Sequence, residues 1–209
     1  MPNWFTGTIQ IIGSPENMKE IHQWTLAYND DTEEPQFNTL CPLPSMGDTW
    51  DDDKWVYEEA CEHWRSKWGI RFPTCIHSAE HNGQHYVDFM YDSAWDMPMG
   101  LFNMIEKKYN VSIYSEGYEP NNAIIEVWKD GHYISNDMDF DSFPDWYADV
   151  NDLNREDLPE FKEGDDIHAW NNGCIDDEDT SNYAEYIDYL VSEAKDEINY
   201  NGGYKYGDE

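Results

Sequence analysis

The most regular chemistry in this sequence is a row of carboxylates on one face of a predicted helix. Residues 183–199 place apolar side chains at helical spacing, which predicts a buried stripe: Tyr183, Tyr186, Ile187, Leu190, Val191, Ala194 and Ile198. Thr180 or Ser181 is suited to cap this helix. The acidic residues face outward: Glu185, Asp188, Glu193, Asp196 and Glu197. Carboxylates three or four residues apart lie about 5–6 Å from each other on a helix, so the segment predicts a rigid row of negative charge.

Two further acidic rows are expected to extend this one into a partner-binding surface. The first lies in the segment from 51 to 62 and comprises Asp51, Asp52, Asp53, Glu58, Glu59 and Glu62. The second begins at Asp137, Asp139 and Asp141 and runs towards Asp152. Duplex DNA carries one negative charge per about 1.7 Å of its axis, and its binding proteins present a matching array of Lys and Arg. Carboxylate rows are able to imitate that pattern.

A metal centre is the alternative use of these side chains. Asp137, Asp139 and Asp141 have the spacing that opens a calcium loop, but Ser142 replaces the glycine of the sharp turn and Ala148 replaces the final Glu. A weak divalent cation site stays open there. The cluster at residues 176–179 is better explained as the start of a helix, where acidic side chains favour the N-terminal dipole.

Zinc is a second metal alternative. Cys75, His77, His81 and His85 supply sulfur and imidazole ligands, and His81 and His85 flank a predicted hairpin turn. Their spacing matches no recognised zinc motif, and solvated turn histidines explain the pattern as well. We therefore expect no bound metal or other cofactor.

The sequence predicts no catalytic residue. It has neither a nucleophile elbow nor a phosphate-binding glycine loop. With 45 Asp and Glu, a chance pair of carboxylates says nothing about acid–base catalysis. The chain is expected not to be an enzyme.

A formal net charge of −33 on 209 residues sets the class of partner. Direct binding to nucleic acid or to a membrane is disfavoured because both are anionic. A basic protein or a cation is the natural complement. Alternatively the acids only solvate the surface, as they do in a high-salt environment. Aromatic residues make up 16% of the chain, which is too many for a disordered acidic tail.

Compartment is predicted from the N-terminus and the cysteines. The first residues lack a signal peptide, and no stretch has the roughly 20 apolar residues of a membrane span. Cys41, Cys61, Cys75 and Cys174 are far apart and include no Cys-x-x-Cys pair. Reduced thiols and a cytoplasmic location are expected.

The first two thirds of the chain predict an α+β fold. Strands are expected at 4–12, 86–91, 111–118 and 122–128, followed by a short strand that ends at Ile134. Helices are expected from Pro15 to Leu26, over 51–68 and over 97–109. Ser14 is the expected N-cap of the first helix. Asn82-Gly83 predicts a hairpin turn, and Asp130-Gly131 a second turn. An antiparallel sheet with helices on one face follows.

The chain is predicted to divide into a domain at 1–136 and an acidic, mostly helical extension at 137–209. The extension holds 23 acidic and 4 basic residues. Because it also contains many aromatic residues, the extension is expected to pack on the sheet domain, whereas its last residues, 201–209, are expected to fray.

The tryptophans have two interpretations. Trp50, Trp55, Trp64, Trp68 and Trp95 are enough to form a base-stacking platform for single-stranded nucleic acid. Such platforms sit in positive grooves, whereas these residues have acidic neighbours, so core packing is favoured.

An ordered set of short motifs resembles a known family. The motifs are Met1-Pro2-Asn3-Trp4, Gly13-Ser14-Pro15, Phe37–Pro44, His63–Gly69, Ser93-Ala94-Trp95 and Gly117–Pro120. In this order they are similar to the YubB ferredoxin-like domain family over about residues 1–135. The chain departs from that pattern at Phe5, where the family tends to have Cys, and in Arg65–Gly69, where it tends to have Gly-Thr-Lys-Trp-Asp.

The resemblance implies a ferredoxin-like fold and an origin in a phage or plasmid; the family has no established biochemical function. Together with the acidic rows, it leads to the hypothesis of a viral or plasmid inhibitor that acts as a DNA mimic. Its partner would be a basic nucleic-acid-binding protein of the host, in defence (as in anti-restriction) or DNA processing. For a protein of phage or plasmid origin, the expected cytoplasmic location is the cytoplasm of the host cell. An acidic assembly protein without DNA mimicry and a carboxylate-site metal enzyme are the rival hypotheses.

Overall fold

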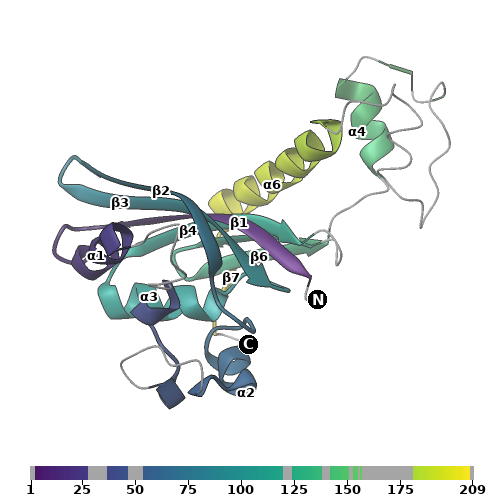
Figure 1. The fold of residues 1–209 in the computed structure, drawn as a ribbon. Helices are drawn as coiled ribbons and strands as arrows, with labels where there is room; N and C mark the ends of the chain where they lie inside the picture. Colours follow the sequence, from purple (N-terminus) through teal and green to yellow (C-terminus); the bar gives the residue numbers. More distant parts are fainter. Residues whose placement is uncertain are drawn as a thin grey trace.

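A computed structural model of the chain describes residues 3–27, 37–46, 54–119, 124–137, 142–150, 153–154, 156 and 181–207. A seven-stranded sheet lies at its centre, in the order β2-β3-β1-β4-β5-β6-β7, and every neighbouring pair is antiparallel. Helices pack on this sheet (Figure 1). The predicted α+β class is confirmed.

The strands are joined by tight turns at two of the predicted places. Their bounds are β1 (Trp4–Gly13), β2 (Arg71–His81), β3 (Gln84–Ala94), β4 (Ser112–Glu119), β5 (Ile124–Lys129), β6 (His132–Asp137) and β7 (Tyr204–Lys205). Asn82 and Gly83 connect β2 to β3 with φ of 52° and 76°, and Asp130 and Gly131 connect β5 to β6 with φ of 48° and 77°. Two successive positive φ angles match the right-handed twist of a hairpin, which is why Asn-Gly and Asp-Gly occur here.

The helices follow the expected order with shifted ends. Their bounds are α1 (Lys19–Ala27), α2 (Tyr57–His63), α3 (Met99–Tyr109), α4 (Phe143–Val150) and α6 (Ser181–Asn201), with short 3-10 helices η1 (Phe37–Leu40) and η2 (Pro44–Met46). Before α1, the backbone N–H of Asn17 donates to Ser14 Oγ at 3.3 Å and that of Met18 to the Ser14 carbonyl at 2.9 Å. The chain therefore turns at the predicted cap, but the regular helix begins at Lys19.

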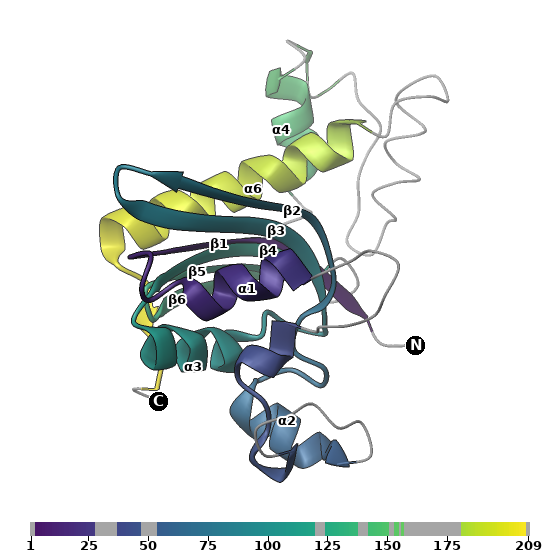
Figure 2. The same ribbon diagram turned by 60° about the vertical axis from the view of Figure 1, so that its left-hand side comes forward.

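The sheet is covered on both faces, and the two faces have separate cores. On one face α1, α2 and α3 enclose a large aromatic core that includes Phe5, Phe89 and Trp128. On the other face α6 packs on β4, β5 and β6 through the smaller cluster of Ile125, Val127, Ile134, Ile187, Val191, Ala194 and Ile198. Figures 1 and 2 show α6 on the opposite side of the sheet from α1 and α3.

Helix α6 carries the predicted apolar stripe. Tyr186, Ile187, Val191, Ala194 and Ile198 are all buried, whereas the side chain of Tyr183 lies outside the described residues. Among the helices that the structure describes, none is long and apolar enough to cross a bilayer.

The helix expected over 51–68 is wrong in its length. Regular helix spans only Tyr57–His63, and residues 51–53 lie outside the described part of the chain. Trp64 is fully buried, and Arg65 then takes a left-handed φ of 58°, which ends the helix. Ser66, also buried, lies 2.7 Å from the hydroxyl of Ser93, so the residues after the helix pack as a loop.

One expectation for the C-terminal third is also wrong. Residues 201–209 are expected to fray, yet in the part that the structure describes, up to residue 207, Tyr204 pairs with Tyr133 in β7 and the ring of Tyr206 lies 5.4 Å from that of Trp128. The extension packs on the sheet through α6, and the aromatic side chains of α4 pack on α6. Phe143, for example, lies 5.0 Å from Tyr186. Strand β7 joins the predicted extension to the same sheet as the predicted domain.

Gly117 gives a test of how tightly β1 and β4 are paired. It faces Gly7 across the two strands, and a Cβ at Gly117 would collide with the backbone of Thr6 and Gly7 and with the ring of Phe5. We expect Gly117→Ala to lower the free energy of unfolding by roughly 1–3 kcal/mol, as overpacking does. Urea denaturation measures this effect, and Ser112→Ala, at an exposed position of the same strand, is the control. Equal stability of both variants would contradict the described packing.

Candidate functional site

The outward face of α6 carries a dense group of exposed carboxylates. Its exposed carboxylates are those the sequence predicts: Glu185, Asp188, Glu193, Asp196 and Glu197. At 1.5 Å of rise per residue they extend over about 18 Å of helix, with a mean axial step of about 4.5 Å. At about 100° per residue, Glu185, Asp188, Glu193 and Asp196 lie on the half of the helix opposite the buried stripe, whereas Glu197 lies at the edge of the stripe, next to Tyr186 and Leu190. The stripe therefore fixes which way the acids point.

Asp137 lies beside this row. With Glu193 and Glu197 it lines a hollow of about 380 Å³ between β6 and α6, whose floor includes Ile125 and Ala194. The side-chain amide of Asn136 donates to Glu197 Oε2 at 3.4 Å across the hollow. The structure thus brings Asp137 to the row, as predicted. Asp139 and Asp141 lie outside the described residues.

The acids of α2 do not extend the row. Glu58 and Glu62 are exposed and Glu59 is half-buried, where its carboxylate accepts the backbone N–H of Ser45 at 3.1 Å. Helix α2 packs beside α3, on the opposite face of the sheet from α6. The expectation of one continuous surface from α2 to α6 is therefore wrong, because both acidic helices are amphipathic and each covers a different face. Asp51, Asp52 and Asp53 lie outside the described residues.

Two lysines near α6 make contacts away from the outward carboxylates. Lys195, on the same helix, is directed to Glu116 on β4, with Nζ 2.8 Å from Oε2. Lys129 donates to the side-chain oxygen of Asn199 at 2.5 Å. Both contacts fix α6 to the sheet and leave the outward carboxylates facing solvent.

The residues proposed for zinc are spread along the β2–β3 hairpin. His85 Nε2 lies 3.2 Å from Glu80 Oε2, and His77 Nδ1 lies 3.6 Å from Asp88 Oδ2. Cys75 is a free, exposed thiol. Within the described ranges, no three His, Cys, Asp or Glu side chains are grouped so that they would hold a metal ion.

The tryptophans divide between core and surface. Trp64 is fully buried and its indole N–H donates to the Cys41 carbonyl at 3.0 Å, as core packing predicts. Trp68 and Trp95 are half-buried, and the Lys67 ammonium lies 4.4 Å and 5.8 Å from their ring centroids. Trp50 is outside the described residues.

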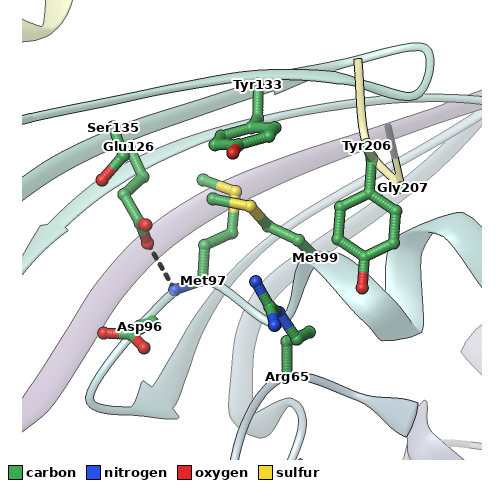
Figure 3. A pocket seen from close by; sticks show the side chains of 9 residues that line it. All are labelled: Arg65, Asp96, Met97, Met99, Glu126, Tyr133, Ser135, Tyr206 and Gly207. Atoms are coloured by element: carbon green, nitrogen blue, oxygen red, sulfur yellow. Dashed lines mark hydrogen bonds between the residues drawn. The ribbon is translucent and has the colours of Figure 1, made fainter. Parts of the chain in front are cut away.

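A second site, which sequence reasoning missed, is a cavity of about 450 Å³ on the face opposite α6 (Figure 3). Its lining comes from five separate segments of the chain: Arg65, Asp96, Met97, Met99, Glu126, Tyr133, Ser135, Tyr206 and Gly207. Glu126 is 5% exposed and accepts the backbone N–H of Met97 at 2.6 Å. The sequence contains one signal of this site: Glu126 is a charged residue inside the apolar run Ile124–Trp128. Alternation along a strand places Glu126 on the same face as Trp128, so a buried carboxyl could have been predicted.

Burial controls the ionisation of the carboxyl groups here. Loss of solvent raises the pKa of Glu126 from 4.5 to about 7, against the hydrogen bond from Met97, and nearby Asp96 adds to the rise. The pKa of Asp96 is raised by loss of solvent and by Glu119, while Arg65 lowers it. Burial also raises the pKa of the Tyr206 hydroxyl, and Arg65 opposes that shift.

No protein-family model, curated protein sequence or solved structure matches this chain.

The raised pKa of Glu126 predicts a pH-dependent effect of Glu126→Gln. In the folded wild type the carboxyl stays protonated up to about pH 7, whereas in the unfolded chain it ionises near pH 4.5. The protonated carboxyl of Glu126 therefore contributes its full stability below pH 4.5. As the pH rises from 4.5 to 7, the free energy of unfolding falls by roughly 3 kcal/mol. We expect the variant to match the wild type at pH 4.5 and to be more stable at pH 8, by up to about that amount.

Urea denaturation at the two pH values measures this difference. Glu58→Gln, at an exposed position, is the control and should show a nearly constant difference from wild type. A Glu126→Gln difference that does not grow with pH would contradict a buried, protonated Glu126.

Proposed function

We propose that this chain is an acidic DNA mimic that binds and blocks a basic nucleic-acid-binding protein. The observation that carries the proposal is the rigid carboxylate row on the outward face of α6. Its mean axial step of about 4.5 Å is of the same order as the rise of about 3.4 Å along the DNA axis per phosphate of one strand. A surface that binds phosphates along a duplex would meet a similar series of charges here.

Rigidity supports the same function. A flexible acidic tail loses conformational entropy when it binds, whereas α6 is already held by its buried stripe and by the contact of Lys195 with Glu116. The hollow lined by Asp137, Glu193 and Glu197 offers a place for one Lys or Arg side chain of the partner. Tyr189, which is 41% exposed among these acids, adds an aromatic contact of the kind that anchors interfaces.

We further propose that the first part of the chain is a ferredoxin-like module, in accord with its resemblance to the YubB family. The sheet order β2-β3-β1-β4 supports this, and so does the chain order, which follows the β-α-β-β-α-β arrangement with η1, η2 and α2 inserted between α1 and β2. Strands β5 to β7 and helix α6 are then additions that build the acidic face. An origin in a phage or plasmid and a target in host defence or DNA processing belong to the same proposal.

A capture experiment tests the mimicry. The immobilised chain is exposed to nuclease-treated bacterial lysate at low salt and eluted with about 0.5 M salt. The expected result is a nucleic-acid-binding protein in the salt eluate, whose binding to the chain is competed by duplex DNA. A captured protein that resists salt and is not displaced by DNA would favour an assembly protein and contradict mimicry.

The position of the surface is tested by neutralising α6. The variant carries Glu185→Gln, Asp188→Asn, Glu193→Gln, Asp196→Asn and Glu197→Gln, and its control carries the same number of neutral replacements at Glu16, Glu20, Glu58, Glu62 and Glu80, away from α6. We expect the α6 variant to lose about tenfold or more in affinity for the captured protein, with a shallower salt dependence. An equal loss in the control would mean that total charge, and not the α6 row, determines binding.

A further inference from the structure

The cavity on the other face of the sheet has an ordered distribution of charge. In Figure 3 the carboxyl groups of Glu126 and Asp96 lie on one side, whereas the guanidinium of Arg65 and the hydroxyl of Tyr206 lie on the other. The side chains of Met97 and Met99 lie between them, and the ring of Tyr133 closes the top. The cavity is therefore dipolar, with an apolar middle.

The backbone is strained where it supplies the charged residues. Arg65 has a φ of 58° directly after α2, at a position where a helix usually ends in glycine. Trp95, with a φ of 74°, immediately precedes Asp96. Left-handed backbone at a non-glycine residue costs of order 1 kcal/mol or more, and such strain clusters at functional sites. Both strained residues place an ionic group in the same cavity.

The balance of groups excludes several ligand classes. A free anion is disfavoured because the carboxylate of Asp96 faces it as well as Arg65, and above about pH 7 the ionised Glu126 adds a second negative charge. A simple organic cation satisfies the carboxyl side but meets the guanidinium at the opposite side. A metal ion finds no group of three suitable ligands among the residues described. A molecule with an ammonium group at one end and an anionic group at the other satisfies both sides.

We propose that this cavity binds a small zwitterion of the α-amino acid type. Its ammonium group would lie at Glu126 and Asp96, its carboxylate at Arg65 and Tyr206, and its side chain against Met97, Met99 and Tyr133. The volume of about 450 Å³ falls in the range of small-molecule sites. The site lies on the opposite face of the sheet from α6, so it is independent of the proposed mimicry.

Ligand-observed NMR with a panel of free L-amino acids, each up to about 10 mM, tests the proposal. Propylamine and propionate serve as probes that carry only one of the two charges. We expect at least one amino acid to bind about tenfold more tightly than either of these probes. No binding by any amino acid, or equal binding of propylamine, would overturn the proposal.

Two variants locate the bound molecule. Arg65→Gly removes the guanidinium and relieves the left-handed strain, so the variant should fold at least as stably as wild type. It is expected to bind the amino acid no more tightly than propylamine. Asp96→Asn, at an exposed position, is expected to weaken binding of the amino acid and to strengthen binding of propionate, because it removes a negative charge that faces the anion. Lys107→Gln, on α3 and outside the cavity, is the control; amino acid binding by Arg65→Gly at the wild-type level would overturn the assignment.

Discussion

Burial of the central strands on both faces is the constraint on which the rest of this structure depends. Strand β5 shows it most clearly, because Ile125 and Val127 point to α6 while Glu126 and Trp128 point to the face covered by α3. A strand that is apolar on both faces needs a cover on each. Helix α6 supplies the second cover, and its position follows from the sheet and not from its charges.

This arrangement explains how so acidic a chain can hold a charged helix in place. Repulsion among carboxylates opposes compaction, so the apolar contacts beneath α6 must outweigh it. Burial of side chains such as Ile187, Val191 and Ile198 contributes roughly 1.5–3 kcal/mol each relative to exposure. Repulsion between neighbouring surface charges is far smaller and is reduced by salt. The same helix can therefore be both a structural cover and a dense display of charge.

Sequence patterns predicted the parts of the fold that depend on local chemistry. The turns at Asn82-Gly83 and Asp130-Gly131 and the stripe of α6 were predicted because a few neighbouring residues determine each. Strand β7 was missed because Tyr204 pairs with Tyr133, far away in the chain, and its glycine-rich surroundings resemble a frayed end. Helix α2 was predicted too long because the aromatic and acidic spacing continues beyond it, although burial of Trp64 and the turn at Arg65 end the helix.

The same distinction between local and long-range determinants applies to the two candidate sites. The α6 acids were predicted residue by residue because one helix carries them all, whereas their separation from the α2 acids depends on which face each helix covers. The cavity was not predicted, because Arg65, Asp96 and Glu126 come together only when distant segments meet. Glu126 alone left a sign in the sequence, as a charge within an apolar strand.

The margins of the sheet also affect how this chain meets copies of itself. At one margin, β2 breaks its register twice, and Phe72 and Cys75 have positive φ on either side of Pro73. At the other, β7 pairs with only His132 and Tyr133 of β6, and the uncovered end of β6 reaches Asp137 beside the acids of α6. Irregular backbone and like charge both hinder strand addition between molecules. Over the described residues, the sheet thus presents poor templates for edge-to-edge aggregation.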